Sequence, residues 1–263
     1  MESSGRAALV SRLRAAGCVY AEDEAELLLA AAQSPAVLAD LTDRRVAGVP
    51  LEYLLGWAEF CGLRIAVDEG VFVPRARTAL LVELAAELTG PAPAVVDLCC
   101  GSGATTVALA HRLAPRWLAA ADIDPAAAAC ARRNVTGLNA EVYEGDLFAP
   151  LPRQWRGRLD LVVANAPYVP TDAVALMPPE ARLHEAPVAL DGGPDGLSVL
   201  RRVGADAVDW LTPGGHLVVE AGTTQIEALC DAFSKAGLIP TVHQDEDLDA
   251  TALTARRPPD PTP

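Results

Sequence analysis

The sequence predicts an α/β fold with a doubly wound, mostly parallel sheet. From about residue 78 onward, strand-like apolar runs alternate with segments whose apolar residues recur at helical spacing. The run Leu159–Ala164 is short, apolar and rich in β-branched residues, as in a central strand covered on both faces. Alternation of this kind is typical of parallel strands joined by crossover helices, and ligands bind such sheets at the carboxyl ends of the strands.

The N-terminal part of the chain predicts short helices followed by a hairpin. Apolar residues recur at helical spacing over 6–16 and 22–32, and Pro35 begins a third helix that extends to about residue 45. Between residues 57 and 73, Gly62 and Gly70 are turn points that separate strand-like pieces. We therefore expect a helical domain over residues 1–56 and a β-hairpin linker over 57–77.

The rest of the chain predicts a larger domain over residues 78–258 and a disordered tail over 259–263. A Pro- and Gly-rich stretch, 166–196, interrupts the alternation after the central strands. The expected helices cover 79–88, 104–113, 126–134, 197–210 and 225–236. The expected strands cover 94–99, 117–123, 140–146, 159–165, 216–222, 241–244 and 252–255.

Composition narrows the classes of function. The 35 acidic residues outnumber the 21 Lys and Arg, and the net charge of −14 argues against nucleic-acid binding. No uncharged apolar run is long enough to span a membrane, and the N-terminus lacks a secretory signal. The six cysteines form no C-x-x-C pair, so a reduced cytoplasm is expected. The four histidines lie in separate segments without metal-ligand spacing, and we expect no metal site.

Glycines and aspartates gather where the predicted strands end. Gly101 and Gly103 follow the first strand and would let the backbone approach a ligand at a helix N-terminus. Asp97 beside this loop disfavours a pyrophosphate and suits a ligand with a cationic end. Asp122 ends the next strand, where an acid can hold ribose hydroxyls, and Asp146 is placed to accept from the amino group of a base. Each aspartate alone could instead be a turn or cap residue, but together they fit S-adenosylmethionine (SAM) better than NAD.

The motifs resemble those of a known enzyme family. D-x-C-x-G-S-G at Asp97–Gly103 resembles the first motif of class I SAM-dependent methyltransferases, with Cys99 where many have a glycine. Asn165-Ala166-Pro167-Tyr168 resembles the N-P-P-Y motif of enzymes that methylate planar amide or amine nitrogens. Further segments resemble the HemK/PrmC family of protein-(glutamine-N5) methyltransferases: Gly48–Gly62, Val71–Glu83, Ala189–Val203 and Leu211–Gln225. The resemblance covers most of the chain from residue 48 and implies a Rossmann-like methyltransferase domain.

The resemblance implies a reaction and a set of site residues. The family methylates the glutamine side-chain amide in the Gly-Gly-Gln loop of peptide-chain release factors. Asn165 Oδ1 and the Ala166 carbonyl would accept the two amide hydrogens, with Pro167 beside them and Tyr168 packed on the flat amide. The SAM-binding residues would be Asp97, Cys99, Gly101, Gly103, Asp122, Ile123, Asp146, Leu147 and Asn165. We expect a monomer whose partner is a release factor, without contact to nucleic acid or membrane.

Several features leave alternatives open. Asn165–Tyr168 could be a strand-ending turn. Glu220 could be an acid that supports the site from behind, although a core-edge carboxylate is the preferred interpretation. The sequence departs from the family at Ala166, at Ala186 and at Arg77 and Ala79, which replace common acids; the N-terminal domain also looks about one helix short. The acceptor could therefore be another protein or a small amide or amine, or the chain could bind SAM without catalysis. A DNA adenine acceptor is disfavoured by the negative charge.

Overall fold

The computed structural model describes the backbone of residues 2–260 and the side chains of residues 5–260. Its main feature is a seven-stranded sheet of order β5-β4-β3-β6-β7-β9-β8. The strands are β3 (Ala94–Leu98), β4 (Trp117–Asp122), β5 (Glu141–Glu144), β6 (Leu159–Ala164), β7 (Leu211–Glu220), β8 (Ile239–Asp245) and β9 (Ala250–Arg256). The pairs from β5 to β7 are parallel, and β9 is antiparallel to both β7 and β8. The predicted doubly wound, mostly parallel sheet is confirmed.

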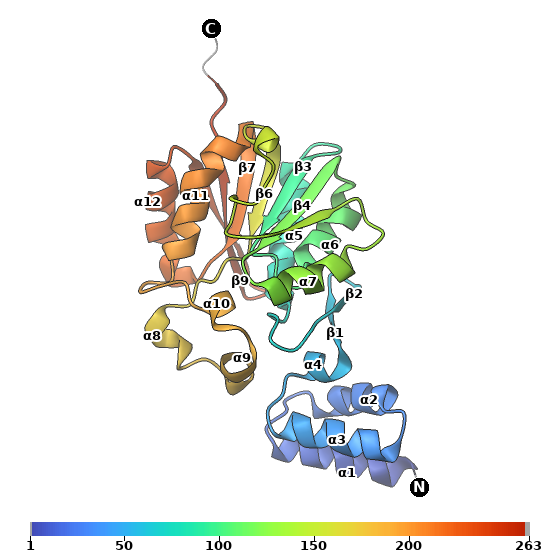
Figure 1. The fold of residues 1–263 in the computed structure, drawn as a ribbon. Helices are drawn as coiled ribbons and strands as arrows, with labels where there is room; N and C mark the ends of the chain where they lie inside the picture. The colour runs from blue at the N-terminus through green and yellow to red at the C-terminus, as the bar shows by residue number, and fades with distance from the viewer. Residues whose placement is uncertain (1, 261–263) are drawn as a thin grey trace.

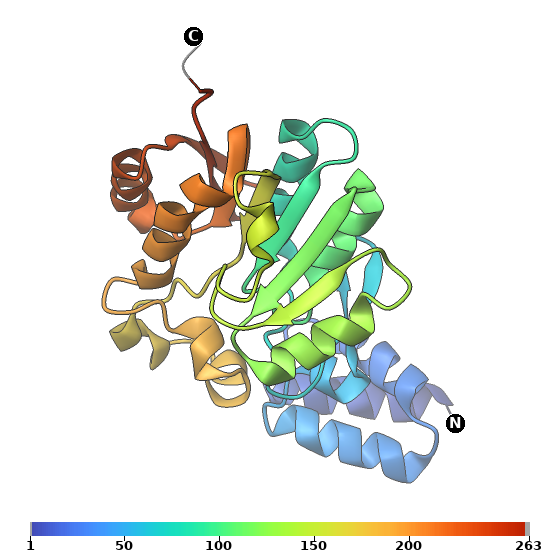
Figure 2. The ribbon, with the colours of Figure 1, turned by 45° about the horizontal axis from the view of Figure 1, so that its top comes forward.

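Helices cover both faces of this sheet (Figures 1 and 2). Val96, Leu98 and Val162 point to the face covered by α11 (Ser198–Trp210) and α12 (Ile226–Lys235). The alternate residues Val95 and Leu161 pack on the other face, where α5 (Ala79–Leu88), α6 (Ala104–Leu113) and α7 (Pro125–Asn134) lie. Burial on both faces explains why the central strands are continuous apolar runs.

The strand order reverses between β3 and β6. From β3 the chain moves outward through β4 to β5, whereas β6 lies on the other side of β3 and continues to β7. In doubly wound sheets such a reversal opens a crevice beyond the carboxyl ends of the two strands, because their following loops turn in opposite directions. The loops after β3, β4, β5 and β6 carry the glycines, aspartates and Asn165 that the sequence singled out.

The N-terminal helices form a bundle apart from the sheet (Figure 1). The helices α1 (Glu2–Ala15), α2 (Ala21–Ala31) and α3 (Pro35–Val46) share a small core that contains Leu13 and Leu28. After α4 (Leu51–Leu55), the strands β1 (Trp57–Phe60) and β2 (Leu63–Ala66) pair as an antiparallel hairpin. These elements lie where the sequence predicts helices and a hairpin. The division into domains at residues 56, 77 and 258 stays a prediction.

The stretch between β6 and α11 is more structured than its composition suggests. It contains three short helices, α8 (Thr171–Val174), α9 (Pro179–His184) and α10 (Pro187–Leu190). Proline at the first position of α9 and α10 costs no hydrogen bond and fixes a helical φ, so proline begins these helices rather than preventing them. The predicted disordered tail falls mostly on residues 261–263, outside the described residues. Over residues 2–260, no helix has the length and apolar character needed to cross a membrane.

Candidate active site

A cavity of about 300 Å³ lies at the carboxyl ends of the central strands. Its lining includes Phe72 and Arg75 from the linker segment and Val188 and Leu190 from α10. The structure brings together here almost all the residues singled out from the sequence: Asp97, Cys99, Gly101, Asp122, Ile123, Asp146, Leu147, Asn165, Ala166, Pro167 and Tyr168. Of the predicted set, Gly103 alone does not line the cavity.

The glycine loop after β3 owes its shape to three residues with positive φ. Cys99, Gly101 and Gly103 have φ values of +55°, +56° and +79°. At Gly103 an added Cβ would lie 3.1 Å from the Cβ of Ala131, so this glycine allows α6 and α7 to approach closely and does not itself face the ligand space. Burial raises the pKa of the Cys99 thiol, which keeps it a small neutral group beside the cavity.

Asp97 and Asp122 are held in fixed positions at the cavity. Asp97 is 1% exposed and accepts a hydrogen bond from Thr106 Oγ1 at 2.6 Å. Burial raises its pKa to about 7, because a carboxylate without a counter-charge is costly in a desolvated place. Asp122 accepts from the backbone N–H groups of Gly101 at 2.8 Å and Asp124 at 2.9 Å, and burial raises its pKa as well. Each Asp122 oxygen keeps a second lone pair for a ligand hydroxyl.

The third aspartate has a partner that the sequence did not predict. Asp146 forms an ion pair with Arg202 of α11, with 2.6 Å between Oδ2 and Nη2, and both residues line the cavity. Next to it, Leu147 is buried with a φ of +49°. Ile123, which also lines the cavity, is 52% exposed and offers an apolar surface. An apolar wall beside a fixed carboxylate suits a flat heterocycle with polar edges.

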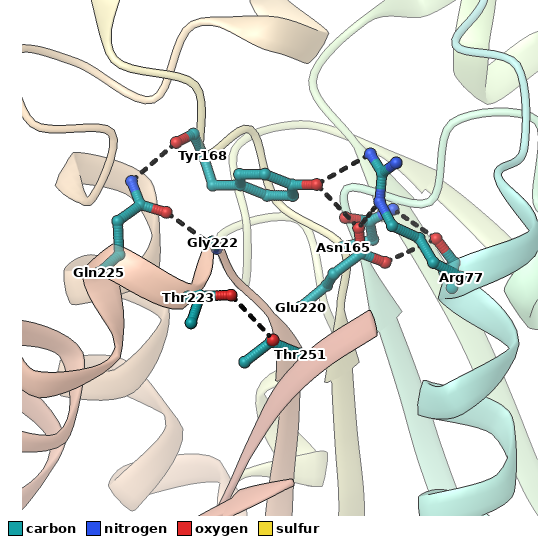
Figure 3. Close-up of polar contacts among 9 residues, drawn as sticks. Arg77, Asn165, Tyr168, Glu220, Gly222, Thr223, Gln225 and Thr251 are labelled. Atoms are coloured by element: carbon teal, nitrogen blue, oxygen red, sulfur yellow. Dashed lines mark hydrogen bonds and ion pairs between the residues drawn. The ribbon is translucent and has the colours of Figure 1, made fainter. Parts of the chain in front are cut away.

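The Asn165–Tyr168 segment leaves the end of β6 and lines the same cavity. Asn165 donates through Nδ2 to Thr78 Oγ1 at 3.2 Å, and Ala166 is buried. The Tyr168 hydroxyl donates to Glu220 Oε1 at 2.9 Å and accepts from Arg77 Nη2 at 3.0 Å (Figure 3). Burial raises the pKa of Tyr168 to about 12, so its ring is a neutral wall near neutral pH.

Glu220 belongs to this site, and interpreting it as a core-edge carboxylate left out its contacts. It is 3% exposed and accepts from Thr78 Oγ1 at 2.6 Å and from Arg77 Nε at 2.9 Å, besides Tyr168. The sequence places Glu220 at the end of a strand, but the pairing of that strand with β6 is not visible in it. In the sheet, Ala164 pairs with Val219, so Glu220 at the end of β7 lies level with Asn165, which follows β6.

The loop before α11 and the turn before α12 both contact the backbone of the Asn165–Tyr168 motif. Gln225 donates through Nε2 to the carbonyl oxygen of Tyr168 at 2.8 Å (Figure 3). It also donates to the carbonyl oxygen of Asp195 at 3.0 Å. The loop before α11 also contacts the residue that follows the motif, because the backbone N–H of Gly192 donates to the carbonyl oxygen of Val169 at 2.8 Å. The backbone of the motif is therefore fixed from one side by the loop before α11 and the turn before α12.

Comparisons with known proteins agree with this geometry. The family described as "Methyltransferase small domain" matches residues 63–202. A release factor glutamine methyltransferase of Moorella thermoacetica is 40% identical over 87% of this chain and 88% of its own. One of Geobacter sulfurreducens is 42% identical over 75% of this chain and 69% of its own.

Among solved structures, a T. thermophilus 16S rRNA methyltransferase in complex with AdoMet and guanosine has the same fold. Its TM-score is 0.54 at 21% identity, and the match covers 76% of this chain and 49% of that one. The similarity in fold extends over the sheet and its helices, whereas the sequence identity to the two bacterial enzymes spans most of both chains. The chain belongs to the release factor glutamine methyltransferase family, within the SAM-dependent methyltransferases of this fold.

Proposed function

We propose that this protein transfers a methyl group from SAM to the side-chain amide nitrogen of a glutamine, in the Gly-Gly-Gln loop of a peptide-chain release factor. The observation that carries the proposal is Asn165, whose amide nitrogen is tied to Thr78 at one end of a cavity that also contains Asp97 and Asp122. Membership in a family of enzymes named for this reaction supports the choice of acceptor.

The cavity fits SAM by the chemistry of its lining. Asp97 is a desolvated acid that a cationic amino group would stabilise, and Asp122 has free lone pairs for two ribose hydroxyls. Ile123 would offer an apolar surface to the adenine, and Asp146 would accept from its amino group. When bound, SAM supplies a methyl group on a positively charged sulfur. Cys99 and Gly101, which both have a positive φ, keep the backbone of the glycine loop beside the cavity.

The acceptor amide is a weak nucleophile because its lone pair is delocalised into its carbonyl. Asn165 Oδ1 and the carbonyl oxygen of Ala166 accept hydrogen bonds from its two N–H groups and so orient the nitrogen. Tyr168 packs against the plane of the amide. Holding reactants in this way can supply about 7–11 kcal/mol of the barrier. Each aimed hydrogen bond can supply roughly 3 kcal/mol. At position 166 the acceptor is the backbone carbonyl oxygen, which alanine and proline both have. Alanine in place of the family's proline therefore leaves this hydrogen bond intact.

The N-terminal bundle would hold the protein acceptor. Arg45 of α3 reaches α9 through Glu180 Oε1 at 2.5 Å, and α9 leads into α10, which lines the cavity. A surface built in this way is continuous from the bundle to the catalytic end of the sheet. A cytoplasmic location and a monomeric state stay predictions, as do the absence of nucleic-acid contacts and of a metal.

Transfer of labelled methyl from SAM to purified release factor tests the proposal. We expect incorporation with the wild-type protein, and none when the Gly-Gly-Gln glutamine of the release factor is replaced by alanine. Free glutamine and small amides run in parallel distinguish a small-molecule acceptor. Calorimetric SAM binding with no transfer to any acceptor would contradict the proposal and indicate a non-catalytic protein.

A further inference from the structure

Residues outside the catalytic motif form a closed hydrogen-bonded set with Asn165 and Tyr168. Thr78 ends the short helix η1 (Ala76–Thr78), which precedes α5, and Glu220 ends β7. Asn165 Nδ2 lies 3.2 Å from Thr78 Oγ1, and Thr78 Oγ1 lies 2.6 Å from Glu220 Oε2. The side chains thus form a chain of contacts that runs from a buried carboxylate to the catalytic amide.

Counting protons along this chain fixes the direction of each hydrogen bond. The Glu220 carboxylate, paired with the Arg77 guanidinium at 2.9 Å, can only accept. The Thr78 hydroxyl has a single hydrogen, and the short contact shows that it is donated to Glu220. Thr78 Oγ1 can then only accept from Asn165, and only the NH₂ group of Asn165 can donate. The oxygen Oδ1 must be the atom of Asn165 that remains for a ligand.

We infer that Thr78 and Glu220 are positioning residues that set the direction of the Asn165 carboxamide, so that its oxygen and not its NH₂ group meets the acceptor. This inference rests on the proposed function. An asparagine turned by 180° would present its NH₂ group, a donor, to the N–H group that Oδ1 otherwise accepts. That hydrogen bond would be lost, and the Ala166 carbonyl alone would not hold the acceptor nitrogen in line.

Arg77 makes the arrangement stable by supplying the counter-charge. Its Nε and Nη2 contact Glu220 Oε1 and the Tyr168 hydroxyl, at 2.9 and 3.0 Å. Because the Tyr168 hydroxyl uses its own hydrogen toward Glu220, it accepts from Arg77 without conflict. One carboxylate therefore orders both the carboxamide of Asn165 and the ring of Tyr168.

Substitutions at Thr78 test the inference by kinetics. Thr78→Val keeps the shape of the side chain and removes the hydroxyl, and we expect kcat for the release factor to fall roughly tenfold, with the Kd for SAM unchanged. Thr78→Ser restores the hydroxyl and should restore kcat. Thr254→Val is the matched control, since Thr254 is also buried and its hydroxyl contacts His243 on β8, away from the cavity. Equal kcat values for Thr78→Val and Thr78→Ser would overturn the inference.

Glu220→Gln tests the proton count itself. A glutamine there can donate to Thr78 Oγ1, which frees the threonine hydrogen to point at Asn165 and favours the reversed carboxamide. We expect a loss of kcat at least as large as that of Thr78→Val. A variant with wild-type kcat would show that the direction of the carboxamide is set elsewhere.

An NMR measurement without acceptor separates this inference from the proposed function. With ¹⁵N-labelled asparagine, the NH₂ protons of Asn165 should show nuclear Overhauser contacts to Thr78 in the wild-type protein and lose them in Glu220→Gln. Absence of these contacts in the wild-type protein overturns the inference even if glutamine is methylated. Conversely, their presence supports it even if the acceptor proves to be a different amide.

Discussion

Asp97 is a cavity residue whose charge changes close to neutral pH. Its folded-state pKa of about 7 is above its ordinary value of 3.8, because burial disfavours the charged form. The folded protein therefore binds this proton more tightly than the unfolded chain does. The stabilising contribution is complete below about pH 3.8 and is lost as the pH rises through about 7. Near and above neutral pH, the buried carboxylate therefore lowers the free energy of unfolding. We interpret this loss of stability as the consequence of keeping an acid in place for a cationic ligand.

This interpretation predicts a pH dependence of SAM binding. Below about pH 7 Asp97 is protonated and cannot attract the amino group, so affinity should weaken by up to about tenfold per pH unit. Above that value the dependence on Asp97 should level off. Calorimetric titrations of the wild-type protein and Asp97→Asn between about pH 6 and pH 8 measure it. Titration of SAM itself affects both proteins equally, so identical slopes would contradict the role of Asp97.

The residues at the strand ends were predictable, but their partners were not. Strand-ending aspartates and the Asn165–Tyr168 motif can be read from the order of residues, since each is local in sequence. Thr78, Arg77 and Glu220 reach Asn165 and Tyr168 only through the pairing of β7 with β6 and the position of η1. Contacts that join residues 78, 165 and 220 depend on the tertiary fold, which no local pattern encodes.

Among the elements, the loop before α11 packs tightly against the backbone of the catalytic motif, and Gly192 lies at the contact. A Cβ added to Gly192 would lie 2.5 Å from the carbonyl oxygen of Gly196 and 2.6 Å from that of Pro167. Both neighbours are backbone atoms, which cannot move without shifting the motif. The glycine is therefore required by close approach and not by a positive φ.

Gly192→Ala should displace the motif. We expect a loss of about 1–3 kcal/mol in the free energy of unfolding, typical of overpacking, together with a large loss of methyl transfer. Gly90→Ala is the matched control, because nothing lies within 4 Å of an added Cβ there. Thermal unfolding and labelled transfer measure both effects. If the two variants behave alike, the loop does not support the motif.

Element types were largely predictable from periodicity, and the exceptions have a physical origin. The helices 79–88 and 104–113 have the expected bounds, because their apolar faces are long and regular. The sequence of the stretch 166–196 shows only a Pro- and Gly-rich composition, yet it contains α8, α9 and α10. These helices are too short to show a period. Contacts such as Glu185 with Arg75 at 2.5 Å, which tie the segment to the linker, hold it in place.

At the scale of the whole molecule, a buried arginine connects the N-terminal bundle to the catalytic end of the sheet. Arg45 is 7% exposed and contacts Glu24 of α2 at 2.6 Å, Glu180 of α9 at 2.5 Å and the carbonyl oxygen of Val49 at 3.2 Å. The Glu24 contact lies within the bundle, whereas the Glu180 contact crosses to α9. Removing Glu180 should therefore loosen the orientation of the bundle without unfolding it.

We predict that Glu180→Ala raises the KM for the release factor about fivefold, equivalent to roughly 1 kcal/mol, and leaves the Kd for SAM unchanged. The reason is that a loosely held bundle loses more freedom when it binds a protein acceptor. Glu26→Ala, which breaks an exposed ion pair with Arg6 inside the bundle, is the control. Steady-state kinetics with the release factor measure the KM of both variants. An unchanged KM in Glu180→Ala would argue against a role of the bundle in holding the acceptor.

The central claim is that two oxygens, from Asn165 and Ala166, orient a glutamine amide for methylation. Tandem mass spectrometry of a release factor treated with SAM and the enzyme tests it most directly. We expect one methyl group on the amide nitrogen of the Gly-Gly-Gln glutamine with the wild-type protein, and none with Asn165→Ala, which still binds SAM. A methyl group on another residue, or an unchanged yield with Asn165→Ala, would contradict it.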